Sequence, residues 1–160
     1  LNVGVWNGYS FLAGLLGNSD KRCIGVDNFS QFGGPEDDFR RRFAQFRSTA
    51  HSFHDQDYEA YLRTRHKEPL GVYFYDGEHS YKNQYTGLRA AEKFFAPGCW
   101  ILVDDTNWDE PREAPLEFIR RSRRRYRLVL DVRTPYSGHP TWWNGLMLLQ
   151  HLGPIRKRKG

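Results

Sequence analysis

The stretch "GVYFYDGEHSYKNQYTGLRAAEKFFAPGCWILVDD", residues 71–105, decides the fold of this chain. Apolar runs at 71–76 and 100–105 are typical of strands, and the segment between them has a helical pattern. An apolar stripe marks this helix, which we expect over residues 81–95: Tyr85, Leu88, Ala91, Phe94 and Phe95. The helix is expected to stop before Pro97–Gly98. The stretch therefore predicts a strand–helix–strand unit.

The same alternation extends over the rest of the chain. Apolar runs predict strands at 1–5, 22–27, 50–55, 71–76, 100–105, 126–132 and 142–152. Helical patterns predict helices at 9–17, 36–47, 58–66 with Asp57 as its cap, 81–95, and from Pro111 to about Arg125. Runs without alternation suit strands buried on both faces, so the fold class is α/β with a mostly parallel sheet. Only a turn-rich segment, 133–141, separates the last two strands, which favours an antiparallel hairpin at one edge.

Length and composition indicate a single domain. The 160 residues are 16% aromatic and 27% charged, and no window approaches the about 18 apolar residues of a membrane span. The N-terminus lacks a signal-peptide pattern, and a strand that begins at residue 1 suggests that upstream residues are missing. Cys23 and Cys99 are isolated, which favours two reduced thiols in a cytoplasmic protein over one disulfide.

The net charge of +5 is concentrated in two places. Arginines crowd residues 120–127, and "RKRK" at 156–159 closes the chain. Such clusters can hold nucleic acid, but no aromatic residues interleave with the arginines to stack on bases. A solvated helix face followed by a disordered tail is therefore the favoured interpretation.

The first two strands end on residues suited to a nucleoside. Gly4 and Gly8 flank a turn into a helix, where the backbone can approach a ligand closely. Asp27 follows about twenty residues later, at the place where a carboxylate can bond ribose hydroxyls. The glycine spacing is not that of a dinucleotide fingerprint, and a tight turn with Asp27 as a turn residue is the alternative.

The fourth and fifth strands end on acidic residues. Asp76, Glu78 and His79 follow one strand, and Asp104 with Asp105 ends the next. Carboxylates that converge at one sheet edge make a hard-cation site, and the ion can lower the pKa of a substrate hydroxyl. His79, one helical turn beyond Asp76, would be near enough to accept the proton. The alternative is that the two aspartates cap a loop and His79 lies on a helix surface.

These segments resemble a known family. "VGVWNGYS" (3–10), "CIGVDNF" (23–29) and residues 75–108 are similar to the class I S-adenosylmethionine-dependent methyltransferases. Within that class they resemble the small-molecule and sugar O-methyltransferases of the macrocin O-methyltransferase type. The similarity extends from Leu1 to about Leu152, and its most specific part is a "DG-[DE]-H-S-Y … PGG … DD" pattern. The resemblance implies a Rossmann-like fold with helices on both faces and a seven-stranded sheet of order 3-2-1-4-5-7-6, strand 7 antiparallel.

The resemblance also implies roles for single residues. The turn from Gly4 to Gly8 would approach the methionine part of the cofactor, and Asp27 would hold the ribose hydroxyls. The full cofactor set is Asn2, Gly4, Gly8, Ser10, Asp27, Asn28, Asp55 and Asp76. The metal ligands, for Mg²⁺, would be Asp76, Asp104 and Asp105, and His79 with Asp76 would form the catalytic pair.

The sequence departs from the family at several places. Asn2 stands where the family has an acidic residue, Cys99 replaces the second glycine of "PGG", and the N-terminal helices that cover the site are absent. We expect a methyltransferase domain over residues 1–153 and a basic tail over 154–160.

The expected activity is Mg²⁺-assisted methylation of a hydroxyl on a sugar, phenol or polyketide, by a chain that is not bound to a membrane. The sequence leaves the acceptor and a homo-oligomeric state open. The alternatives are a non-catalytic binding domain of a longer carbohydrate-modifying protein and an RNA methyltransferase. A dinucleotide-dependent oxidoreductase is the weakest of the alternatives.

Overall fold

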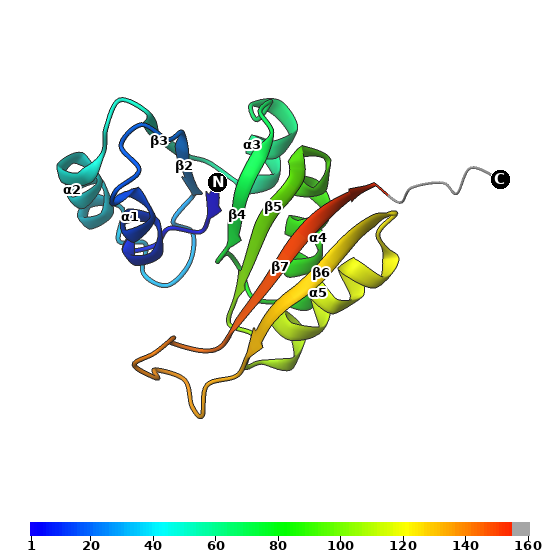
Figure 1. Ribbon diagram of the computed structural model, residues 1–160. Helices are drawn as coiled ribbons and strands as arrows, with labels where there is room; N and C mark the ends of the chain where they lie inside the picture. Colours follow the sequence, from blue (N-terminus) through cyan, green and yellow to red (C-terminus); the bar gives the residue numbers. More distant parts are fainter. Residues whose placement is uncertain (155–160) are drawn as a thin grey trace. The chain divides into compact units, whose positions relative to one another are not determined.

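The computed structural model describes residues 1–154, in which helices and strands alternate (Figure 1). The strands are β1 (Asn2–Val3), β2 (Cys23–Asp27), β3 (His51–Asp55), β4 (Leu70–Tyr75), β5 (Phe95–Asp104), β6 (Arg124–Val132) and β7 (Leu146–Pro154). The helices are α1 (Tyr9–Leu15), α2 (Glu36–Phe46), α3 (Tyr58–Thr64), α4 (Tyr81–Ala91) and α5 (Asp109–Arg121), with a 3₁₀ turn, η1 (Glu92–Phe94).

The strand order is β3-β2-β1-β4-β5-β7-β6, as predicted. β7 runs antiparallel to both of its neighbours, β5 and β6, which confirms the C-terminal hairpin. Within the described residues, no helix is both long enough and apolar enough to cross a bilayer.

The chain forms two compact units, and the first comprises Leu1–His66. Its strands β1, β2 and β3 are parallel. Phe53 of β3 packs against Phe39 of α2, whereas its neighbour His54 packs against Tyr61 of α3. Because successive strand residues point to opposite faces, α2 and α3 cover opposite faces of this sheet. Asp57 caps α3 as predicted, accepting from the backbone N–H of Ala60 at 2.8 Å.

The core of the first unit is largely aromatic. Phe11 of α1 and Phe43 of α2 lie 5.8 Å apart between ring centroids, and both are buried. Aromatic pairs at this separation stabilise beyond their buried area. This cluster therefore holds α1 and α2 together on one face of the strands.

The second unit begins at Lys67 and contains β4 to β7 with α4 and α5. Tyr73 and Tyr75 lie on one face of β4, are fully buried, and face α4, where the Tyr73 hydroxyl donates to the Gly87 carbonyl at 3.0 Å. α5 packs beside α4. Ser80 caps α4, and its Oγ accepts from the N–H of Asn83 at 3.3 Å.

Two predicted helix ends are wrong. The helix expected to reach residue 95 ends at Ala91, because Phe95 pairs with Leu70 and begins β5. The register shift that follows accommodates Pro97–Gly98 inside the strand rather than at a helix end. The helix expected to reach about Arg125 ends at Arg121, because Arg124 already pairs with Pro154. The arginine cluster is therefore divided between a helix and a strand.

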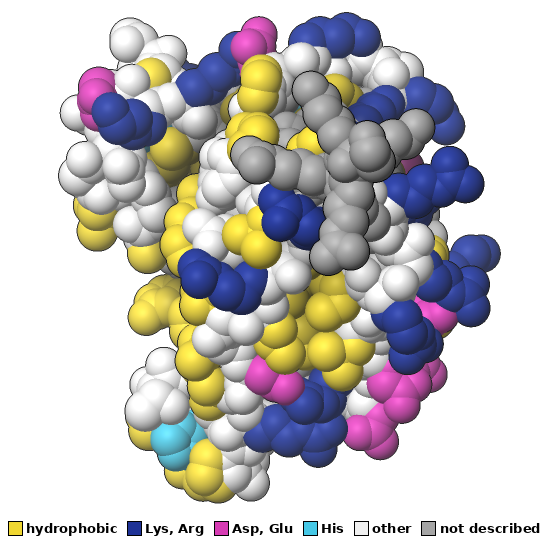
Figure 2. Space-filling model, turned by 45° about the vertical axis from the view of Figure 1, so that its right-hand side comes forward, with side chains coloured by type: hydrophobic (Ala, Val, Ile, Leu, Met, Phe, Trp, Pro, Cys, Tyr) yellow, Lys and Arg dark blue, Asp and Glu magenta, His cyan; other side chains and the backbone are white. Residues whose placement is uncertain are grey.

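The edge strand β6 is partly exposed. Leu128 and Leu130 each leave 41% of their surface open, as expected for a strand with a neighbour on one side only. Figure 2 shows hydrophobic side chains exposed among Lys and Arg on the side of the chain that carries β6 and β7. Pro154, expected in the tail, belongs to β7, and the rest of the predicted basic tail lies outside the described residues. Cys23 and Cys99 are both free, as predicted, and Cys99 is buried.

Candidate functional site

Two loops of the second unit carry the predicted metal and catalytic residues. Asp76 and His79 lie in the loop from β4 to the Ser80 cap, and Asp105 follows β5 directly. β4 and β5 are parallel, so the loops after their carboxyl ends lie at one edge of the sheet. His79 is not on a helix, because α4 starts only after Ser80, so the alternative that placed His79 on a helix surface is wrong. Asp105 has a left-handed backbone, with φ of 58°, which turns the chain sharply out of the strand.

The structure brings Asp76, His79 and Asp105 together. One ligand atom from each lies within 4.8 Å of the other two. His79 Nε2 and Asp105 Oδ2 are 2.8 Å apart, and these side chains are only 16% and 13% exposed. The His79 ring also packs against the indole of Trp108 in a T-shaped arrangement, with centroids 5.8 Å apart. Two carboxylates and an imidazole are donors that fit a divalent cation.

Asp104 has different surroundings from its neighbour. Its Oδ1 accepts from the indole N–H of Trp142 at 2.7 Å and from the Asp105 backbone N–H at 2.8 Å. Burial is the main cause that raises the pKa of Asp104, and the Asp105 charge raises it further, while the Trp142 bond opposes the shift. Asp104 is not part of the three-residue group, and its role as a metal ligand stays a prediction.

The loop after β5 is held by the connection between β6 and β7. Asn107 donates from Nδ2 to the carbonyl and hydroxyl oxygens of Thr134 at 3.0 and 2.9 Å, and its Oδ1 accepts from the Thr134 N–H at 2.9 Å. The Asn107 N–H donates to the carbonyl of Asn144. Sequence reasoning missed Asn107, Thr134 and Trp142. The signal available for Thr134 and Trp142 was weak, because they are a polar and an aromatic residue in a segment, 133–143, that has no regular pattern.

The end of α4 that faces these loops is also anchored by acidic residues. The Tyr81 N–H donates to Glu110 of α5 at 2.8 Å, and Ser80 Oγ donates to Glu78 at 3.1 Å. Glu78 therefore acts as a polar neighbour of the helix cap, and it is not part of the three-residue group.

In the first unit, Asp27 organises the ends of β1 and β2. Its Oδ2 accepts from the N–H groups of Val5 and Trp6 at 2.7 and 2.9 Å, and its Oδ1 accepts from Phe29 at 2.8 Å. Asp27 thus makes the contacts of a turn residue, which was the alternative to ribose binding. Its ribose role stays a prediction.

The other predicted cofactor residues lie around the same strand ends. Gly4 and Gly8 have positive φ of 77° and 93°, as the predicted turn into α1 requires. Asn2 is buried and donates to the Gly4 carbonyl at 2.6 Å. Ser10 lies in the first turn of α1, Asn28 accepts from Ser30, and Asp55 pairs with Arg40 at 3.0 Å.

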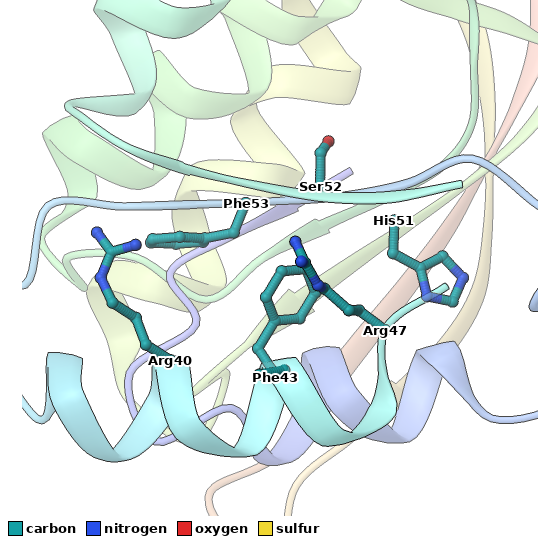
Figure 3. A pocket seen from close by; sticks show the side chains of 7 residues that line it. Arg40, Phe43, Arg47, His51, Ser52 and Phe53 are labelled. Carbon is teal, nitrogen blue, oxygen red and sulfur yellow. The ribbon is translucent and has the colours of Figure 1, made fainter. Parts of the chain in front are cut away.

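A pocket of about 310 Å³ lies elsewhere in the first unit, between α2 and β3 (Figure 3). The guanidinium of Arg40 lies over the Phe53 ring at 5.2 Å, and that of Arg47 over Phe43 at 5.9 Å. Both ring nitrogens of His51 are engaged, by the Ser48 N–H and the Asn18 carbonyl. None of the predicted site residues lines this pocket.

Comparisons with known proteins agree with this arrangement. A family profile described as a methyltransferase domain matches residues 1–106, whereas no curated protein sequence matches the chain. Similar solved structures include an O-methyltransferase from Bacillus cereus in complex with SAH (TM-score 0.66, 15% identity, 94% of this chain and 72% of that one). TomG from Streptomyces achromogenes has a TM-score of 0.66 at 15% identity, over 95% of this chain and 72% of its own. NovP, also an O-methyltransferase, has a TM-score of 0.70 at 16% identity, over 93% of this chain and 69% of its own.

At such identities the solved structures establish the fold, and the family profile covers more than half of the chain. The resemblance to the class I S-adenosylmethionine-dependent methyltransferases is thereby confirmed: the chain belongs to the methyltransferase-domain family.

Proposed function

We propose that the chain transfers the methyl group of S-adenosylmethionine to a hydroxyl of a small molecule or sugar. The observation that carries this proposal is the group formed by Asp76, His79 and Asp105 at the ends of β4 and β5. Methyl transfer to oxygen needs a hydroxyl that gives up its proton, and this group offers the carboxylates and imidazole to assist that step.

The cofactor half of the proposal rests on the first unit. The positive-φ turn from Gly4 to Gly8 leaves backbone accessible to the methionine part, and Asp27 stands at the end of β2. The B. cereus relative is in complex with SAH and TomG is in complex with SAM. Asn28 and Asp55, beside the same strand ends, are proposed to contact the ribose and adenine side.

The metal half rests on the second unit. Asp76 and Asp105, with Asp104 beside them, would hold a divalent cation such as Mg²⁺. When bound, such an ion lowers the pKa of a hydroxyl that it contacts. Two roles are open to His79: the proton acceptor that the sequence predicts, or a further ligand to the ion.

The acceptor is proposed to be a hydroxylated small molecule. CalS11, a solved structure of the same fold, is a TDP-rhamnose 3′-O-methyltransferase, which supports a sugar as one candidate. The partly exposed ring of Trp108, beside His79, provides an apolar surface for an acceptor ring. Two free thiols support a reducing, cytoplasmic environment.

Calorimetric titration with S-adenosylhomocysteine tests the cofactor half. We expect saturable binding by the wild-type chain, reduced about tenfold or more in Asp27→Asn, since charged hydrogen bonds contribute about 1.5–3 kcal/mol. The matched control is Asp20→Asn, because Asp20 is exposed and pairs with its neighbour Lys21. A folded wild-type chain that gives no heat at about 1 mM ligand would instead be a non-catalytic binding domain.

A further inference from the structure

We infer that His79 is a ligand of the divalent ion, so that this site selects a transition ion such as Mn²⁺ or Co²⁺ over Mg²⁺. The inference rests on the proposed function, because it assigns the ion that the proposed reaction uses. It changes one role in that reaction: an imidazole nitrogen that binds the ion cannot also accept the proton of the substrate.

The first step concerns which donors are available. Asp104 Oδ1 is held by two hydrogen bonds, from the Trp142 indole and from the Asp105 N–H, and its carboxylate lies outside the group. The third donor that accompanies Asp76 and Asp105 is therefore a nitrogen of His79 rather than a third carboxylate.

The second step concerns spacing. His79 Nε2 and Asp105 Oδ2 are 2.8 Å apart. Two adjacent ligands of an octahedral ion with bonds of about 2.1 Å are separated by about 3.0 Å. The observed separation, which is that of a His–Asp ion pair without an ion, is close to this value, and one ligand atom of Asp76 lies within 4.8 Å of a donor atom of each of the two residues. Neutral imidazole with two carboxylates balances the charge of a divalent ion.

The third step concerns the class of ion. Mg²⁺ prefers oxygen ligands and keeps most of its waters, whereas a site with an imidazole nitrogen suits ions of the first transition row, with affinity rising from Mn²⁺ through Co²⁺ to Cu²⁺. One histidine and two carboxylates together offer one nitrogen donor and two oxygen donors. The Trp108 ring against His79 restrains the orientation of the imidazole. The donor set therefore favours a transition ion.

Metal titration of the whole chain, without cofactor or acceptor, tests the inference. We expect Mn²⁺ and Co²⁺ to bind at least about tenfold more tightly than Mg²⁺, since imidazole ligation favours them. In His79→Asn this preference should fall to within about threefold while Mg²⁺ affinity stays nearly unchanged. The matched control is His139→Asn, because His139 is hydrogen bonded to Thr141 in the β6–β7 connection and is not in the group.

A measurement on the wild-type chain avoids any dependence on variant folding. Electron spin-echo modulation of bound Mn²⁺ should show coupling to an imidazole nitrogen. Absence of this coupling, or a His79→Asn variant that keeps the full preference for Mn²⁺, overturns the inference. Equal losses of Mg²⁺ affinity in Asp104→Asn and Asp105→Asn would also overturn it, by identifying an all-carboxylate site. A chain that binds S-adenosylhomocysteine but no divalent ion overturns this inference and leaves the cofactor half of the proposed function intact.

Discussion

At the scale of single residues, Gly87 determines how closely α4 approaches β4. A Cβ added there would lie well inside 3.0 Å of the Tyr75 ring, a distance that side chains do not tolerate. Tyr75 is fully buried, and its hydroxyl donates to the Glu78 carbonyl at 3.2 Å. The absence of a side chain at Gly87 thus lets Tyr75 support the loop that carries Asp76 and His79.

The substitution Gly87→Ala should therefore destabilise the fold by about 1–3 kcal/mol, the usual cost of overpacking a core. Denaturant unfolding measures the change. Gly71→Ala is the control, because nothing lies within 4 Å of a Cβ added at that position of β4. Equal stabilities for the two variants would contradict this account of the helix contact.

At the scale of elements, the loop after β5 depends on a segment far away in sequence. Asn107 makes three hydrogen bonds to Thr134, which is itself buried, and its N–H bonds to Asn144. Asp105, two residues before Asn107, is thereby held in place by the connection between β6 and β7. Local sequence does not encode this restraint.

We expect Asn107→Ala to lower the free energy of unfolding by about 1–3 kcal/mol, because it leaves partly buried groups of Thr134 without their partners. Hydrogen exchange should become faster at residues 105–108 and 133–145 while the first unit keeps its protection. Asn18→Ala serves as the control, since its exposed side-chain amide donates to carbonyls at the end of α1. Unchanged exchange in both segments of Asn107→Ala would rule out the proposed restraint.

At the scale of the whole molecule, a buried thiol and a partly buried phenol link stability to alkaline pH. Burial raises the pKa of the Cys99 thiol to about 12, and burial followed by the Glu92 charge raises the pKa of Tyr126. Both folded-state values exceed the unfolded values of about 8.5 and 10. The stability that these neutral groups contribute is therefore fully present below the unfolded pKa and is lost as pH rises toward the folded pKa.

The melting temperature should accordingly fall between about pH 9 and pH 12, and the fall should be shallower in Cys99→Ala. Cys23, half-buried, is the control, and Cys23→Ala should keep more of the pH dependence because the shift at Cys99 is the larger one. Thiol labelling at pH 8 should modify Cys23 before Cys99. A melting temperature that is constant up to pH 12 would contradict this linkage.

Much of the fold could be predicted from local pattern. Apolar runs located all seven strands, and Asp57 was correctly predicted as a helix cap, because both signals depend on neighbouring residues. The order of the strands came from the family resemblance. The misplaced ends at Ala91 and Arg121 have one physical reason: Phe95 and Arg124 are in strands because of partners, Leu70 and Pro154, that are distant in sequence.

The sequence by itself determined that acidic residues and a histidine would meet at one edge of the sheet, since parallel strands bring their carboxyl ends there. Only the tertiary structure decided which of these side chains contact one another and which are bound elsewhere. Asp105 turns toward His79, while Asp104 is held by the indole of Trp142, a residue 38 positions away. Adjacent side chains at a strand end point in different directions, and the partner of each is chosen by long-range packing, which no local pattern records.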